Sequence, residues 1–295
     1  MDGSRLVKSD PRPLISDLDS LPFPAWDKGP VEIYLRNPIW GGAVKNSSGI
    51  NYKAKKSMNM IVSRGCPYSC NFCYHYVFGK KYRIRSVDNV IEEIRTLKSL
   101  YDIDFVGFVD DNTTADPDWV DDFCYAMMVE DMDIKWGCSA RVNQVDPEML
   151  YFMKAAGCEW IGFGVESASP KILKAMNKKT DPEMAARAIQ MVRDAGIYAN
   201  ATFIAGYPGE TRDDLRMTAT FMKENNCLNS IFYATPYPGT VLYEQAKDKI
   251  ILKYKDEDTY IKQLADATDF RVNLSEMADE ELKEMRSFAM NGVPF

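Results

Sequence analysis

Six short apolar runs, separated by stretches with helical spacing, are the feature that most constrains the fold of this chain. They occupy residues 58–63, 104–110, 134–140, 159–165, 198–204 and 229–234, and none is longer than seven residues. Each run is rich in Ile, Val, Phe, Tyr or Trp, which is typical of buried strands. Strand, helix and strand in repetition predict a parallel sheet with right-handed crossovers. Six units are fewer than the eight of a full barrel, so we predict an α/β fold with a partial (β/α)6 barrel of the TIM type.

The stretches between the runs carry recognisable helix ends. Four of them begin with a capping oxygen followed by a proline, at Asp116-Pro117, Asp146-Pro147, Ser169-Pro170 and Asp181-Pro182. Another begins at Thr211, where Asp214 stands in the position of a capping-box acid. Gly157 and Gly196 lie where two of the helices are expected to end before the next strand.

The two flanking segments differ from the barrel in composition. Residues 1–57 contain six of the fifteen prolines, so we predict an extended N-terminal arm or linker without a long regular element. Residues 58–240 hold the predicted barrel. Residues 241–295 are charged and have helical spacing, which predicts a helical C-terminal extension packed on the barrel.

Composition excludes several classes of protein. A hydrophobic content of 46% supports a sizeable core and excludes a disordered chain. No apolar run approaches the roughly 20 residues that a membrane-spanning helix needs, and the first residues lack an apolar signal segment, so we expect a cytoplasmic protein without membrane contact. The formal net charge of −7 argues against nucleic acid as a partner, except through a local basic groove.

Cysteine and histidine counts point to sulfur rather than imidazole chemistry. The chain has seven cysteines but one histidine, His75, so a metal site built from several imidazoles is excluded. Three of the cysteines, Cys66, Cys70 and Cys73, follow the first run with the spacing C-x3-C-x2-C. Three thiolates on one loop suit an iron–sulfur cluster, in which one iron of four would keep an open position, or a zinc site completed by His75 or another cysteine. The remaining four, Cys124, Cys138, Cys158 and Cys227, are scattered singly and are expected in the core.

The cysteine loop resembles a known signature. The pattern C-x3-C-x-aromatic-C, with Phe72 as its aromatic residue, is similar to that of radical S-adenosylmethionine (radical SAM) enzymes, whose partial barrel the strand pattern also matches. The resemblance implies a [4Fe-4S] cluster on the three cysteines and SAM on the fourth iron. It also implies reductive cleavage of SAM to a 5′-deoxyadenosyl radical and an electron donor of the flavodoxin or ferredoxin type. The protein would place the cofactors and exclude competing reactions.

Polar residues that directly follow the runs are the other site candidates, because chemistry in such sheets lies at the carboxyl ends of the strands. Taken alone, Asp110 and Asp111 are equally well explained as solvent-facing acids, Arg141 as a solvated cation and Ser167 as a helix cap. The resemblance implies contact with SAM for Phe72, Asp110, Asp111, Ser139, Arg141, Glu166, Ser167, Gly206 and Pro208. Tyr237 and Pro238 follow the last run and are expected to line the substrate mouth.

Three further stretches resemble one group within this superfamily. Residues 21–27 (LPFPAWD) are similar to the linker that joins a cobalamin domain to the barrel in cobalamin-dependent radical SAM proteins, and residues 80–94 and 164–178 are similar to that group as well. The group includes methyltransferases and the anaerobic porphyrin cyclase. In that group the cobalt-binding histidine normally precedes the linker. The single histidine of this chain, His75, follows the cysteine loop, so we do not expect it to serve as that ligand. Cobalamin use is therefore expected only from a partner in trans or through binding without a histidine.

The sequence leaves two hypotheses of different classes. The first is a radical SAM enzyme that acts on a small-molecule or peptide substrate by methyl transfer or by radical rearrangement, cyclisation or oxidation. The second is a non-catalytic scaffold or partner subunit that is stabilised by a metal or a cluster. The basic stretch 79–85 (GKKYRIR) would bind an anionic substrate or form a solvated face, and we favour the solvated face.

Overall fold

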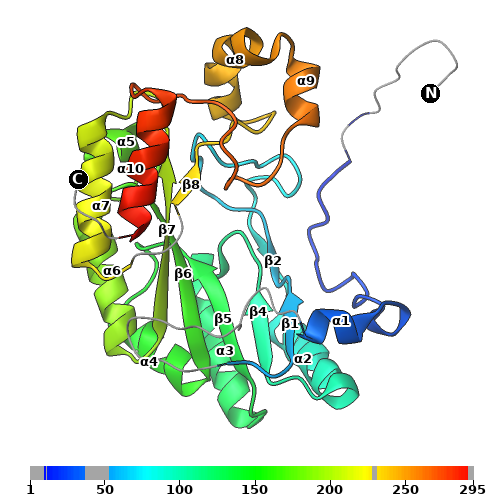
Figure 1. Ribbon diagram of the computed structural model, residues 1–295. Helices are drawn as coiled ribbons and strands as arrows, with labels where there is room; N and C mark the ends of the chain where they lie inside the picture. Colours follow the sequence, from blue (N-terminus) through cyan, green and yellow to red (C-terminus); the bar gives the residue numbers. More distant parts are fainter. Residues whose placement is uncertain (1–9, 11, 37–52, 228–230, 292–295) are drawn as a thin grey trace, which may run out of the picture.

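A six-stranded parallel sheet organises the molecule. We describe a computed structural model of the chain over residues 10, 12–36, 53–227 and 231–291. The sheet curls into a half-barrel (Figure 1) and contains, in spatial order, β1 (Ser57–Met60), β4 (Phe105–Phe108), β5 (Lys135–Ala140), β6 (Cys158–Glu166), β7 (Tyr198–Ala205) and β8 (Ile231–Tyr233). Every neighbouring pair is parallel, which confirms the predicted partial (β/α)6 barrel. The beginning of the last predicted run, residues 229 and 230, lies outside the described residues.

Helices that follow the strands cover the outer face of the curled sheet (Figure 1). They are α2 (Val87–Tyr101), α3 (Pro117–Val129), α4 (Pro147–Ala155), α6 (Pro182–Asp194) and α7 (Arg212–Glu224). The short helix α5 (Pro170–Ala175) instead contributes Ile172 to a second apolar cluster. The predicted caps are confirmed, because the side chains of Asp116, Asp146, Ser169 and Asp181 each accept a backbone N–H of the first turn. Thr211 and Asp214 form the reciprocal capping box at the start of α7.

The main core fills the space between the sheet and these helices. Aromatic side chains from three elements meet there, with ring centroids 5.4 Å apart for Phe108 and Phe123, and 5.2 Å apart for Phe123 and Trp136. Cys124, Cys138 and Cys158 are fully buried in the same core, as their scattered positions predict, and Cys227 is buried there too. Burial of this apolar surface is the principal force that holds the helices on the sheet.

The C-terminal extension divides into two parts. Helix α10 (Asp279–Asn291) lies beside α7 (Figure 1), buries Leu282 and Met285 in the main core and pairs Glu281 with Arg212 at 2.8 Å. It therefore completes the outer helical layer. Helices α8 (Val241–Tyr254) and α9 (Glu257–Lys262) instead form a second apolar cluster near the end of β8, together with Tyr207.

The N-terminal arm runs along the edge of the sheet near β1. The described part of it is extended apart from a short 3-10 helix, η1 (Trp26–Lys28), and a helix of six residues, α1 (Val31–Arg36), which the proline pattern does not predict. The carboxylate of Asp19 accepts the backbone N–H of Ser86, so the arm also contacts the start of α2. None of the helices formed by the described residues has the length and apolar character needed to span a bilayer.

Candidate active site

The cysteines lie on a loop that is closed at its base by a two-stranded ribbon. Strands β2 (Ser63–Arg64) and β3 (Arg83–Ile84) pair antiparallel, so residues 65–82 form one closed excursion at the carboxyl end of β1. Gly65 has φ +87°, and a Cβ there would lie 2.6 Å from the carbonyl oxygen of Lys81. Only glycine fits where the two arms of the loop cross so closely.

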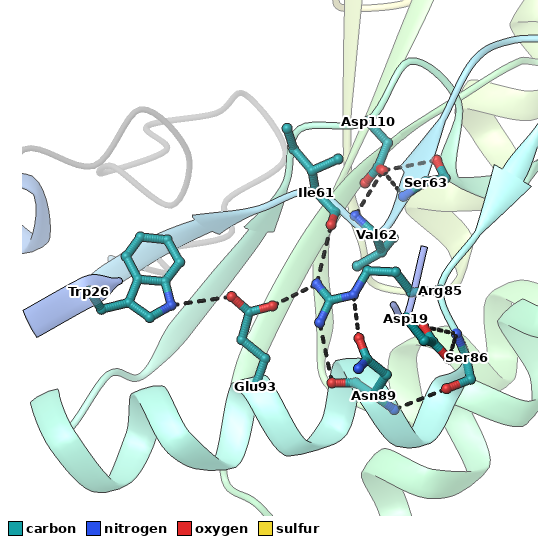
Figure 2. A network of polar contacts seen from close by, with 10 residues as sticks. All are labelled: Asp19, Trp26, Ile61, Val62, Ser63, Arg85, Ser86, Asn89, Glu93 and Asp110. Atoms are coloured by element: carbon teal, nitrogen blue, oxygen red, sulfur yellow. Dashed lines mark hydrogen bonds and ion pairs between the residues drawn. The ribbon is translucent and has the colours of Figure 1, made fainter. Parts of the chain in front are cut away.

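A buried polar network holds the chain that enters this loop (Figure 2). The carboxylate of Asp110 accepts the backbone N–H of Val62 at 3.0 Å, and also both the N–H and the hydroxyl of Ser63. Arg85 pairs with Glu93 at 2.6 Å and donates to the carbonyl of Ile61 at 3.3 Å. Asp110 therefore positions the cysteine loop rather than projecting free from the strand end. Burial raises its pKa to about 7.

The far side of the loop is clamped by α5 and α8. Asn71 donates its side-chain amide to the carbonyl of Ala175 at 2.8 Å, and Asn177 donates to the carbonyl of Ser69 at 2.7 Å. The backbone N–H of Leu242, at the start of α8, donates to the carbonyl of Asn71 at 2.8 Å. The loop is thus fixed on both sides of Cys70, as a preorganised ligand set requires.

The three predicted metal ligands occupy this fixed loop as free thiols. Cys70 is buried, whereas Cys66 and Cys73 are partly exposed. A hydrogen bond from the Cys73 thiol, aided by the charges of Lys178 and Arg141, lowers the pKa of Cys70 to about 6. The same hydrogen bond raises the pKa of Cys73, and burial raises the pKa of Cys66. One thiolate with two further thiols beside it is a soft donor set, which fits a [4Fe-4S] cluster.

The spacing of the three cysteine sulfurs distinguishes a single metal ion from a four-iron cluster. Among the described residues, no three His, Cys, Asp or Glu side chains converge closely enough to hold one metal ion. A four-iron cluster takes each thiolate on a different iron, so it needs no such convergence.

Arg141 lies directly against the cysteine loop. It is buried, its guanidinium Nη1 is 3.7 Å from the Cys70 sulfur, and the guanidinium stacks 3.6 Å from the centroid of the Tyr68 ring. Its other terminal nitrogen donates to the carbonyl of Lys178. A buried arginine in this position stabilises negative charge on the sulfur.

Glu166 forms a buried ion pair with Lys178 beside the same loop. The two charged atoms are 2.8 Å apart, with side chains 10% and 7% exposed, and the Lys178 nitrogen is 5.8 Å from the centroid of the Phe72 ring. Glu166 has φ +71°, and the register between β6 and β7 shifts at this point. A Cβ on Gly164 would lie 2.3 Å from the Glu166 carboxylate, so glycine makes room for the pair.

In the part of the chain that the structure describes, four other predicted site residues form no hydrogen bond or ion pair with the cysteine loop, namely Ser167, Ser139, Asp111 and Tyr237. The hydroxyl of Ser167 is fully buried and hydrogen-bonds to the hydroxyl of Thr218 at 3.2 Å, which fastens the turn after β6 to α7. Ser139 is partly exposed on β5, and Asp111 is exposed, its charge acting on Cys66. Tyr237 is half-buried and its hydroxyl donates to the carbonyl of Ala265 at 3.4 Å.

The turn after β7 contains a buried carboxylate that sequence reasoning did not single out. Glu210 accepts the backbone N–H of Gly206 at 2.6 Å, and burial raises the pKa of Glu210 to about 8. Gly206 has φ +88°, which suits glycine, and Pro208 is partly exposed in the same turn. Glu210 therefore shapes the turn whose Gly206 and Pro208 the resemblance places near SAM.

Besides Glu210, Lys178 and Tyr68 are residues near the cysteine loop that the sequence does not single out. Lys178 stands twelve positions after Glu166, beyond a short helix, and Tyr68 lies within the cysteine loop. A lysine in a run of charged residues normally indicates a solvated face. The one available signal was the proximity of both residues to motifs already singled out.

Comparisons with known proteins give the class of the chain. The model of the Radical SAM superfamily matches residues 60–222, more than half of the chain, and this match includes the cysteine loop. The chain belongs to the radical SAM superfamily.

Two curated relatives are similar to this chain over most of its length. The chain is 35% identical over 247 residues to an uncharacterized methyltransferase of Pyrococcus horikoshii, which covers 83% of this chain and 50% of the relative. It is 29% identical over 293 residues to an anaerobic magnesium-protoporphyrin IX monomethyl ester cyclase of Rubrivivax gelatinosus, covering 97% of this chain and 49% of the relative. The chain thus spans about half the length of these curated relatives.

A solved structure supports the fold. The radical SAM methyltransferase TsrM of Kitasatospora setae, with cobalamin and a [4Fe-4S] cluster bound, superimposes with a TM-score of 0.59 at 16% identity, over 71% of this chain and 41% of that one. At this identity the likeness establishes the shared half-barrel.

Proposed function

We propose that this chain holds a [4Fe-4S] cluster on Cys66, Cys70 and Cys73 and cleaves SAM reductively in order to modify a substrate. The observation that carries the proposal is the clamped loop of three free thiols, placed at the carboxyl end of β1 against two buried cations. When bound, the cluster would supply one electron to the sulfonium of SAM, whose cleavage yields methionine and a 5′-deoxyadenosyl radical.

The charges around the loop support this assignment. Three thiolates bring negative charge into a largely buried place, and Arg141 and Lys178 offset it. Glu166 in turn orients Lys178 through the 2.8 Å ion pair. We assign Arg141, Glu166 and Lys178 to the binding of cluster and SAM, and Tyr237 and Pro238 to the substrate mouth.

The proposed transformation is methyl transfer or a radical rearrangement, cyclisation or oxidation of a small-molecule or peptide substrate. The names of the relatives, a methyltransferase and a porphyrin ester cyclase, support both branches. For methyl transfer, cobalamin would come from a partner in trans or bind to this chain without a histidine ligand. The two branches are separated by adding cobalamin to the reconstituted protein, because stoichiometric uptake supports methyl transfer.

Anaerobic reconstitution tests the proposal. The protein should bind about four irons per chain, turn brown, and release 5′-deoxyadenosine when SAM and dithionite are added. Cys70→Ala should abolish cleavage and lower the iron content. Cys227→Ala, which removes a buried core thiol, should retain both. A colourless protein that holds zinc and never cleaves SAM would instead establish the scaffold.

A further inference from the structure

Two lysine-rich segments that are distant in sequence meet over the cysteine loop. Lys80 donates to the hydroxyl of Ser69 at 3.0 Å, while Asn177 donates to the carbonyl of the same Ser69 at 2.7 Å. Asn177 shares a surface hollow of about 310 Å³ with Lys174 and Lys179. Ser69 directly precedes Cys70, so Lys80 lies at the outer surface of the loop, and the hollow with Lys174 and Lys179 adjoins the same place through Asn177.

The positive charge of this face is not neutralised within the part of the chain that the structure describes. Lys80, Lys81, Lys174 and Lys179 are exposed, and none of them forms an ion pair there. The neighbouring acid Asp181 uses a carboxylate oxygen to cap α6. A cationic face is notable on a chain of net charge −7.

The turn that leads to Lys80 adds apolar surface. The backbone N–H of Gly79 donates to the carbonyl of His75, which closes a turn whose tip carries Tyr76, 78% exposed, and Val77, 61% exposed. Exposed aromatic groups beside charges are typical of protein interfaces rather than of solvated loops. The structure therefore favours a binding role for this stretch over the solvated face that its sequence alone suggests.

We propose that this lysine face is the docking surface for an acidic, low-potential one-electron carrier protein of the flavodoxin type. The inference rests on the proposed function, since it names the donor of the electron that the cluster needs. The carrier would be oxidised by one electron and the cluster on the three cysteines reduced by one, with no bond formed between the proteins. Docking beside Ser69 gives a short path to Cys70, and opposite charges accelerate the encounter.

The test compares two triple variants with the same change in charge. In Lys80→Glu/Lys174→Glu/Lys179→Glu the docking face is reversed. In the control, Lys53→Glu/Lys55→Glu/Lys223→Glu, the exposed lysines lie before β1 and at the end of α7, away from the carboxyl ends of the strands. Each reconstituted protein is mixed with reduced acidic flavodoxin and SAM, and cluster reduction and 5′-deoxyadenosine release are followed at low ionic strength.

We expect the face variant to react about tenfold or more slowly with flavodoxin, and the control variant within about twofold of the unmodified protein. With dithionite, both variants should cleave SAM at the unmodified rate. Raising the ionic strength to about 0.3 M should slow only the proteins with an intact face. Equal flavodoxin rates in both variants would overturn the docking proposal. Failure of the unmodified protein to cleave SAM with dithionite would instead overturn the proposed function.

Discussion

Two buried ion pairs, one at the base of the cysteine loop and one beside its ligands, are used differently by the molecule. In the first pair, the side chains of Arg85 and Glu93 are 11% and 2% exposed. Both also form hydrogen bonds to other parts of the fold (Figure 2): Arg85 donates to Asn89 and Ile61, and Glu93 accepts from Trp26. Within the described residues, the Lys178 ammonium donates only to Glu166. The Arg85–Glu93 pair therefore uses its hydrogen bonds to hold neighbouring parts of the chain. The Lys178 ammonium has N–H donors left that could bind a ligand.

Of the changes that compare the two ion pairs, the largest effect is expected from neutralising the second pair. Glu166→Gln/Lys178→Met should lower the rate of SAM cleavage by about 100- to 1,000-fold, because preorganised charges at a reacting group are worth this much. Replacing both partners leaves no unpaired buried charge, so the free energy of unfolding should change by only about 1 kcal/mol. The measurements are 5′-deoxyadenosine release and urea unfolding. Unchanged cleavage at full iron content would show that the pair is structural, like Arg85 and Glu93.

Breaking the first pair should have the opposite signature. Glu93→Gln leaves the Arg85 guanidinium buried without its counter-charge, which should cost about 3 kcal/mol of unfolding free energy in urea. The SAM cleavage rate per folded, cluster-loaded molecule should be retained. Glu92→Gln is the matched control, because Glu92 pairs with Arg95 at the surface and its loss should be barely measurable. A stable Glu93→Gln protein with impaired cleavage would reverse the assignment of the two pairs.

Two buried carboxyl groups have a raised pKa, about 7 for Asp110 at the base of the cysteine loop and about 8 for Glu210 in the turn after β7. A raised pKa means that the folded state binds the proton more tightly, so stability is greatest below the unfolded pKa and falls as the pH rises through the folded one. The contribution of these two groups to the free energy of unfolding should therefore decrease from about pH 4.5 to about pH 8. Glu210→Gln should remove the part of this decrease that extends to pH 8, and Asp110→Asn the part that ends near pH 7. Urea unfolding of the metal-free proteins at a series of pH values measures both, and unchanged pH profiles would contradict the assigned directions.

The comparison also separates what a sequence can predict from what it cannot. The strands and the helix starts at Asp116 and Thr211 were predictable, because periodicity and capping act between residues a few positions apart. The three closely spaced cysteines could be singled out as candidate ligands for the same reason. Helix α10 was expected to pack on the barrel, but its place beside α7 depends on where α8 and α9 turn the chain, and no local pattern reports this.

Site residues that act through tertiary contacts were harder to assign. Asp110 and Glu166 both follow apolar runs, yet one holds the backbone at Ser63 and the other pairs with Lys178. The identity of the partner decides between a positioning role and a binding role, and the partner of each lies on a different segment of the chain. For this reason the strand-end rule located both carboxylates but did not tell them apart.

The smallest expected effect removes one hydrogen bond from Asp110 and leaves the rest of the network intact. In Ser63→Ala the hydroxyl that donates to the carboxylate at 2.8 Å is lost, while the backbone N–H groups of Val62 and Ser63 still donate. The free energy of unfolding should fall by about 1 kcal/mol, the usual contribution of one hydrogen bond. Ser20→Ala, which removes an exposed hydroxyl bonded to the carbonyl of Asp17, should change nothing measurable. Because the two backbone donors keep the loop entrance in place, iron content and SAM cleavage should also stay unchanged. Loss of iron from Ser63→Ala would mean that the base of the loop and its ligands are one cooperative unit, so that the two regions are not separable.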